Sequence, residues 1–122
     1  RQRQMFKKDS NLATYSNLFI DQGSDFTFSV DLSSAAGSVD LTSHVGRGQI
    51  RKSYTSSTAV DFAISVDVAN SEVIASLTAA QTAAMKPGRY VYDIEILSAA
   101  ATPIITRVLE GQIDVTPRVT TN

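Results

Sequence analysis

The sequence contains no cysteine and no tryptophan, and its one histidine is His44. Without cysteine the chain can form neither a disulfide nor a thiolate metal site, and a single histidine excludes metal motifs built on two. No apolar run approaches the roughly 18 residues that span a bilayer, so we expect no membrane partner. We also expect no metal and no cofactor.

Charge is scarce and unevenly placed. Charged residues make up 19% of the 122 residues, and the formal net charge is −1. The first 17 residues carry a net charge of +3, so residues 18–122 carry −4. Binding to phosphates needs clustered lysine and arginine, and the acidic body therefore argues against nucleic acid as a partner.

What the sequence does contain is a core. Apolar residues make up 43% of the chain, which suits one globular domain of this length. From residue 18 onward they recur at every second position, the period of half-buried strands. The clearest rows are Phe26, Phe28, Val30 and Leu32; Phe62, Ile64, Val66 and Val68; and Tyr90, Tyr92, Ile94 and Ile96.

Clusters of glycine, serine, asparagine and other small residues separate these rows and indicate turns. Strands are predicted at residues 18–21, 25–32, 44–52, 60–68, 73–77, 89–97 and 104–115. These seven strands and their short connections predict an all-β fold, an immunoglobulin-like antiparallel β-sandwich. Gly111 falls inside the last strand and indicates a bulge or bend, through which that strand would serve both sheets.

One segment breaks the two-residue period. Thr78 and Gln81 have the spacing of a capping box, and residues 79–85 favour a short helix. Pro87 and Gly88 end this helix, because Gly88 can take the positive φ that returns the chain to a strand. We therefore expect one short helix that connects two strands across an end of the sandwich.

Three polar residues are the first candidates for catalysis. His44 follows two hydroxyl residues, but neighbours on a strand point to opposite faces, and nucleophilic catalysis needs an oriented base and an oxyanion hole. Asp93 and Glu95 lie on the strand face opposite an apolar row, which favours a solvated surface over a glycosidase or calcium pair. No nucleophile, base and acid share a predicted pocket, so we expect that the protein is not an enzyme.

Two glycines at positions 46 and 48 flank Arg47 and resemble a short phosphate loop only superficially. No helix follows them whose backbone amides could hold a phosphate. Gly46 and Gly48 share a strand face with Ile50. They therefore predict a flat inner surface against which large side chains of the facing sheet pack.

The other face of the same strand carries a polar strip, Arg47, Gln49 and Arg51. With an aromatic neighbour, this strip could bind a sugar or a phosphate. An ordinary exposed strand face is the alternative interpretation. Tyr15 and Tyr54 are the tyrosines left as possible contacts.

A series of short motifs between residues 18 and 120 resembles a known family. In order, the motifs are Asp40-Leu41-Thr42, Gln49-Ile50-Arg51, Ser76-Leu77-Thr78 with Gln81-Thr82, Pro87-Gly88-Arg89-Tyr90-Val91-Tyr92-Asp93-Ile94-Glu95, and Leu109-Glu110-Gly111-Gln112-Ile113-Asp114-Val115 with Val119-Thr120. The series is similar to small β-sandwich structural domains of tailed bacteriophages, of the baseplate, tail-fibre-adaptor, neck or head-decoration type. The element that begins at Pro87 is its most specific part.

The resemblance implies a bacteriophage virion structural or assembly protein that acts through protein–protein contacts. Its partners would then be other virion proteins, and its location the virion. A binding module for a host cell-surface glycan or protein is the alternative.

Residues 1–17 have no counterpart in that family and form a basic N-terminal arm before the sandwich domain at 18–122. Because the arm is positive and the body acidic, we predict that it reaches across a subunit boundary in a homo-oligomer. The alternative is a strand folded back on its own sheet edge. The candidate assembly contacts are Arg1, Arg3, Met5, Phe6, Lys7, Lys8, Leu12 and Tyr15.

Overall fold

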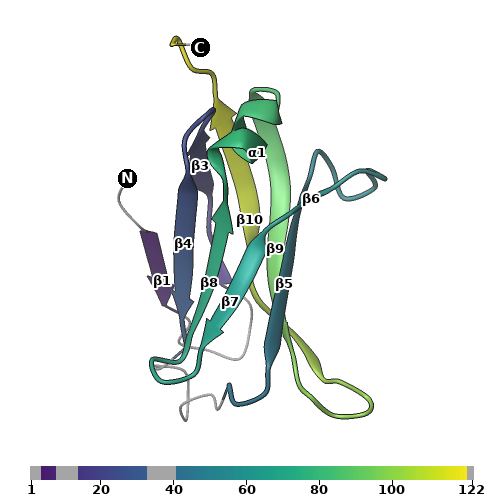
Figure 1. Ribbon diagram of the computed structural model, residues 1–122. Coiled ribbons are helices and arrows are strands. Elements are labelled where there is room, and N and C mark those ends of the chain that lie inside the picture. Colours follow the sequence, from purple (N-terminus) through teal and green to yellow (C-terminus); the bar gives the residue numbers. More distant parts are fainter. Residues whose placement is uncertain (1–3, 8–13, 33–40, 121–122) are drawn as a thin grey trace.

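The computed structural model describes residues 4–7, 14–32 and 41–120, and for residues 4–7 it describes the backbone alone (Figure 1). The elements are β1 (Gln4–Lys7), β2 (Thr14–Tyr15), β3 (Leu18–Asp21), β4 (Phe26–Asp31), β5 (Val45–Arg51), β6 (Val60–Asp61), β7 (Ala63–Asp67), β8 (Glu72–Leu77), α1 (Ala79–Ala84), β9 (Gly88–Leu97) and β10 (Ile105–Thr116). The predicted all-β sandwich with one short helix is confirmed. Within the described ranges, no helix is long and apolar enough to cross a membrane.

Two sheets form the sandwich. A four-stranded sheet has the order β1-β4-β8-β7, and a six-stranded sheet has the order β2-β10-β9-β5-β6, with β3 also paired to β10. Three of these pairs are parallel: β1 with β4, and both β2 and β3 with β10. The prediction of a wholly antiparallel sandwich is therefore wrong. Short connections fix the direction only of strands that follow one another in the chain, and these pairs join strands far apart in sequence.

The predicted strand at 60–68 is divided between the two sheets. Its first part, β6, pairs with β5 in the six-stranded sheet, and its second part, β7, pairs with β8 in the four-stranded sheet. Phe62 lies at the change of sheet, and its backbone N–H donates to the carbonyl oxygen of Gly48 at 3.0 Å. The sequence prediction assigned this change of sheet to the last strand at Gly111, which is wrong, because β10 pairs only within the six-stranded sheet.

The core lies between the sheets and follows the two-residue period. The alternating side chains of β4 that were predicted to be buried are fully enclosed, and in β9 Ile94 is 0% exposed. At the centre, the rings of Phe28, Phe62 and Tyr92 meet edge to face, with centroids 5.5 to 6.4 Å apart. Such pairs add to the stabilisation from area burial alone.

The flat inner surface predicted at Gly46 and Gly48 is confirmed. A Cβ atom at Gly48 would lie 2.9 Å from the carbonyl oxygen of Asp93 and 3.1 Å from the ring of Phe62. At Gly46 the facing side chain is Ile64 of β7. The two glycines therefore let the facing side chains approach the backbone of β5 closely.

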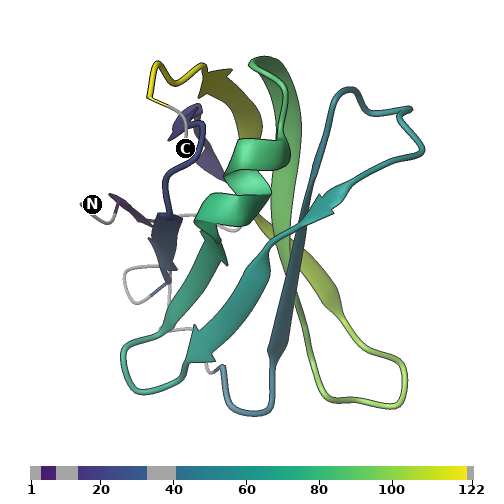
Figure 2. The ribbon, with the colours of Figure 1, turned by 45° about the horizontal axis from the view of Figure 1, so that its top comes forward.

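The short helix α1 crosses the end of the sandwich between β8 and β9 (Figure 2). The capping box is confirmed: the Gln81 backbone N–H donates to Thr78 Oγ1 at 3.2 Å, and the Thr78 backbone N–H donates to Gln81 Oε1 at 2.9 Å. The buried Thr82 hydroxyl donates to the carbonyl oxygen of Ser24 at 2.8 Å, which ties the helix to the turn before β4. Gly88 takes the positive φ that the sequence predicted, 139°.

Replacing the cap tests this local account. Thr78→Ala removes the acceptor for the Gln81 amide, so we expect the free energy of unfolding to fall by about 1 kcal/mol. Thr78→Ser keeps the hydroxyl and is the matched control, for which we expect a smaller loss. Urea denaturation of the three proteins measures the difference. Equal stability of the alanine variant and the wild type would contradict a stabilising role for the cap.

Candidate functional site

The candidate assembly contacts of the arm lie partly within the described residues. Met5, Phe6 and Lys7 belong to β1, which pairs with β4 of the same chain. Tyr15 belongs to β2, which pairs with β10, and its side chain is 60% exposed. Both segments thus pair with the chain's own sheets, the arrangement that the sequence left as the alternative to a subunit crossing. Arg1, Arg3, Lys8 and Leu12 lie outside the described residues.

The polar residues first considered for catalysis do not come together. His44 lies in an exposed turn, where Nδ1 is 3.2 Å from the carbonyl oxygen of Thr42. Asp93 and Glu95 point outward from β9, away from the core, as predicted. In the part of the chain that the structure describes, no three His, Asp or Glu side chains form a group that could hold a metal ion.

A polar surface does assemble on the outer face of the six-stranded sheet. The strip Arg47, Gln49 and Arg51 on β5 lies beside Asp93 and Glu95 on β9, because Arg47 pairs with Glu95 and Gln49 pairs with Asp93. On the far side of β9, Arg107 pairs with Glu95 and Glu110 with Asp93. These pairings form two rows of polar side chains that cross three strands.

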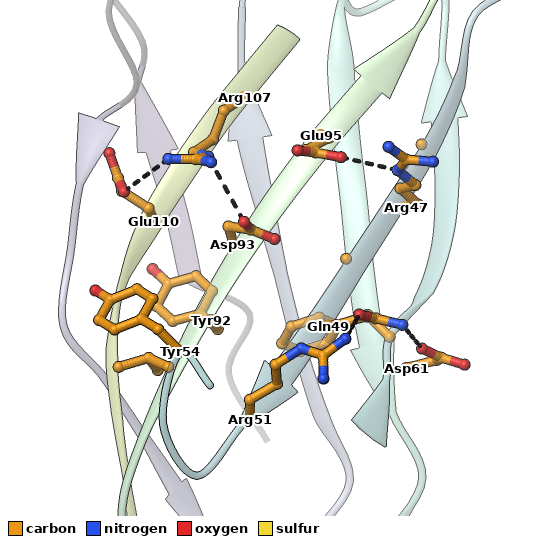
Figure 3. Close-up of a pocket in the computed structure, with 14 residues that line it drawn as sticks. Arg47, Gln49, Arg51, Tyr54, Asp61, Tyr92, Asp93, Glu95, Arg107 and Glu110 are labelled. Atoms are coloured by element: carbon orange, nitrogen blue, oxygen red, sulfur yellow. Dashed lines mark hydrogen bonds and ion pairs between the residues drawn. The ribbon is translucent and has the colours of Figure 1, made fainter. Parts of the chain in front are cut away.

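Ion pairs form both within one row and between the two rows. Arg47 Nε lies 2.8 Å from Glu95 Oε1. Arg107 lies 3.5 Å from Asp93 Oδ2 and 3.3 Å from Glu110 Oε1, and Figure 3 shows its guanidinium between the two carboxylates. These side chains are partly exposed, so each pair contributes at most about 1 kcal/mol. Their main effect is to hold the side chains in defined positions.

The other side of the surface is held by Arg51. Its guanidinium donates to Gln49 Oε1 at 2.9 Å and to the carbonyl oxygen of Ser56 at 2.6 Å. Gln49 in turn donates to Asp61 Oδ1 on β6 at 2.8 Å. Arg51 therefore connects the sheet to the loop after β5, which carries Tyr54, and the Tyr54 side chain is 79% exposed.

Together these residues line a groove with a volume of about 660 Å³. Its lining comprises Gly46, Arg47, Gly48, Gln49, Arg51, Tyr54, Asp61, Phe62, Val91, Tyr92, Asp93, Glu95, Arg107 and Glu110 (Figure 3). The sequence predicted the Arg47–Arg51 strip and kept Tyr54 as a possible contact, and the structure brings them together. The sequence did not indicate that Asp61, Arg107 and Glu110 lie in the same groove, because these residues come from other strands.

The groove contains one carboxyl with a shifted pKa. Burial raises the pKa of Asp93 above its ordinary value, and the neighbouring Glu95 carboxylate raises it further, while Arg107 opposes the rise. Ionisation of Asp93 therefore disfavours the folded state. This penalty is absent below the unfolded-state pKa and is complete above the folded-state pKa.

Asp93→Asn removes that ionisation. At neutral pH we expect the variant to be more stable than the wild type by up to about 0.5 kcal/mol, the usual range for a surface substitution. The gain should vanish at a pH below 3.8, the ordinary pKa of the carboxyl, where the wild type is protonated as well. Urea denaturation at the two pH values measures it. A loss of stability at neutral pH would show that the ion pair with Arg107 outweighs the cost of burial.

Comparisons with known proteins relate the chain to others through its fold. No family model matches the sequence, and no curated protein matches it. Among solved structures, the N-terminal domain of phage TP901-1 ORF48 superposes with a TM-score of 0.62 at 8% sequence identity, over 93% of this chain and 97% of that one. At this identity the similarity shows a shared fold alone.

A second solved structure is the Listeria monocytogenes internalin-like protein lmo2027. It aligns with a TM-score of 0.41 and 16% identity, over 90% of this chain and 30% of that one. We draw nothing from a superposition this loose.

Proposed function

We propose that this chain is a structural component of a bacteriophage virion that acts through protein–protein contacts and not through catalysis. The observation that carries the proposal is the superposition on the phage TP901-1 domain, which covers 93% of this chain and 97% of that domain. The match thus spans the sandwich as a whole and not one shared motif. The phage-like motif series in the sequence supports the same function.

Exposed apolar side chains on the outer face of the six-stranded sheet also support protein contacts. Tyr15 lies on β2 and Phe19 on β3, the two strands that pair with β10 on its edge away from β9. The two residues are 60% and 55% exposed. At one end of the sheet, Val45 and Ile105 flank Leu97 and are 60% and 51% exposed. Aromatic and aliphatic side chains of this kind are enriched at the centres of protein interfaces. We propose other virion proteins and further copies of this chain as the partners.

Light scattering on the purified chain tests the proposal. We expect a homo-oligomer, whose mass falls to that of a monomer when residues 1–14 are deleted or when Tyr15 and Phe19 are both changed to alanine. The double variant is needed because the deletion also removes β1, which pairs with β4. Val119→Ala is the matched control, since its side chain is 98% exposed and lies in neither segment.

Two results would count against this version of the proposal. A wild-type chain that is a monomer at all concentrations tested would contradict self-association. An oligomer whose mass is unchanged in both variants would exclude the arm and the Tyr15–Phe19 edge as its contacts. Circular dichroism on each variant establishes that it is folded before its mass is interpreted.

A second function is favoured by one specific observation. The groove of Figure 3 is lined both by the polar strip that the sequence predicted and by an exposed tyrosine, Tyr54, which lies near Glu110 on the other side of the groove. A sugar-binding groove requires an aromatic group of this kind. A binding module for a cell-surface glycan is therefore the second candidate, and it is compatible with a place in the virion.

A further inference from the structure

We propose that the groove on the outer face of the six-stranded sheet binds a neutral saccharide. The inference rests on the second candidate function and assigns it a site, defined by Arg47, Gln49, Arg51, Tyr54 and Asp93. It does not depend on self-association of the chain.

Size comes first. The groove encloses about 660 Å³, which falls within the roughly 300–1,000 Å³ of small-molecule sites. Its polar lining lies on the outer face of the sheet, and the buried rings of Phe62 and Tyr92 also border it. A ligand would therefore lie across β5 and β9 with one side in solvent, as an oligosaccharide segment can.

The charge balance disfavours an anionic ligand. Three guanidinium groups line the groove, those of Arg47, Arg51 and Arg107, but four carboxylates line it as well. Arg47 and Arg107 already lie within 3.5 Å of Glu95, Asp93 or Glu110. A phosphate or sulfate would have to displace one of these carboxylates and then lie beside it, which like-charge repulsion opposes.

Hydrogen-bonding groups remain available after the internal contacts are made. Arg47 uses Nε for Glu95, and within the described ranges no residue accepts a hydrogen bond from its two terminal nitrogens. Among those same residues, Glu95 Oε2 and Asp61 Oδ2 accept none either. The groove thus offers donors on Arg47 and acceptors on Glu95 and Asp61. Sugar hydroxyls, each of which donates and accepts, suit this pattern.

A peptide strand fits this position less well. Peptides that bind sheets add to an exposed edge, where backbone N–H and C=O groups are unpaired. The groove lies instead over β5 and β9, which are both interior strands of the six-stranded sheet. β9 is paired on both sides, with β5 and with β10, and β5 is paired with β6 at Gln49 and Ile50. A ligand that lies over these strands is therefore recognised mainly by side chains.

Tyr54 supplies an apolar surface on the side of the groove away from the polar strip (Figure 3). Its side chain is 79% exposed. The loop that carries it is held by the Arg51 guanidinium, which donates to Ser56, and by a turn in which Ser56 N–H donates to the carbonyl oxygen of Ser53 at 3.1 Å. An exposed aromatic ring in the same groove as directed polar groups can cover the C–H face of a pyranose while the polar groups bind its hydroxyls.

Titration of the ¹⁵N-labelled full chain, followed by NMR, tests the site. The probes are maltotriose, N,N′,N″-triacetylchitotriose and a rhamnose trisaccharide, with inorganic phosphate as the anionic comparator. We expect at least one trisaccharide to shift the backbone amides of Arg47, Gln49 and Asp93, and we expect phosphate to leave them unchanged. Tyr54→Ala should weaken binding by about tenfold, equivalent to roughly 1.4 kcal/mol. Tyr54→Phe keeps the ring and should retain most of the affinity.

Phe19→Ala is the matched control, because Phe19 is also an exposed aromatic residue on this face but does not line the groove. Its affinity should equal that of the wild type. The inference is overturned if no trisaccharide shifts the groove amides, if phosphate shifts them instead, or if Tyr54→Ala binds as tightly as Phe19→Ala. Each of these readouts is independent of the mass measured by light scattering, so either proposal can fail while the other stands.

Discussion

Ile94→Ala is expected to lower the free energy of unfolding by about 2 to 5 kcal/mol, the cost of deleting a large buried aliphatic side chain and leaving a cavity. Ile94 is 0% exposed and lies on β9, which is paired on both sides, with Gly48 of β5 and with Leu109 of β10. The strand cannot move inward to fill the space without disturbing both ladders. Gly48 has no side chain that could fill it from the neighbouring strand. The cost should therefore lie in the upper part of this range.

Chemical denaturation of Ile94→Ala and of Val91→Ala gives the comparison. Val91 lies on the same strand but faces outward, where its side chain is half-buried. We expect Val91→Ala to cost less than about 1 kcal/mol. Equal losses for the two variants would contradict the register that places Ile94 in the core.

Gly111→Ala is expected to destabilise the fold by about 1 to 3 kcal/mol or more, through overpacking against backbone. A Cβ atom at this position would overlap the carbonyl group of Ser16, with 2.7 Å to its carbon. Ser16 cannot easily retreat, because its N–H donates to Glu110 at 2.8 Å and its carbonyl oxygen accepts the Tyr92 hydroxyl at 2.7 Å. Relief of the overlap would break at least one of these hydrogen bonds, and the Tyr92 hydroxyl is partly buried.

Gln112→Ala is the matched control for Gly111→Ala. Gln112 is the next residue of β10, and its half-buried side chain lies on the outer face. We expect this variant to stay within about 0.5 kcal/mol of the wild type in the same urea denaturation. Wild-type stability of Gly111→Ala would show that the segment around Ser16 does not pack against β10 as described.

The elements that could be predicted from sequence are those fixed by nearby residues. The alternation from Tyr90 to Ile96 located β9, and the spacing of Thr78 and Gln81 located the helix cap. The positive φ of Gly88 was predicted correctly because Pro87 and Gly88 form a local turn signal between the helix and β9. Each of these features depends on contacts within a few positions along the chain.

The features that could not be predicted depend on partners far away in sequence. Gly111 was interpreted as a bulge or bend, but the register shift of β10 lies between Arg107 and Leu109, and Gly111 instead accommodates Ser16. Nothing near Gly111 in the sequence indicates that residue 16 lies against it. For the same reason the parallel pairing of β3 with β10 had no local signal.

The groove, too, could be predicted only in part. The strip Arg47, Gln49 and Arg51 could be predicted from one strand. Arg107 and Glu110 could not be assigned to the same face, because residues three apart on a regular strand point to opposite faces. The register shift between them brings both onto the outer face, since the extra residue reverses the alternation. The two-residue period of the sequence therefore could not predict the bulge that completes the groove.

Quantitative mass spectrometry of virions purified from a culture that produces this chain tests the proposed virion role most directly. We expect peptides of this chain in the particles. Its copy number per particle should be a multiple of the rotational symmetry of one part of the virion. Antibody labelling in electron micrographs should then place it on one part of the particle. A chain that is abundant in the infected-cell lysate but missing from purified virions would contradict the account.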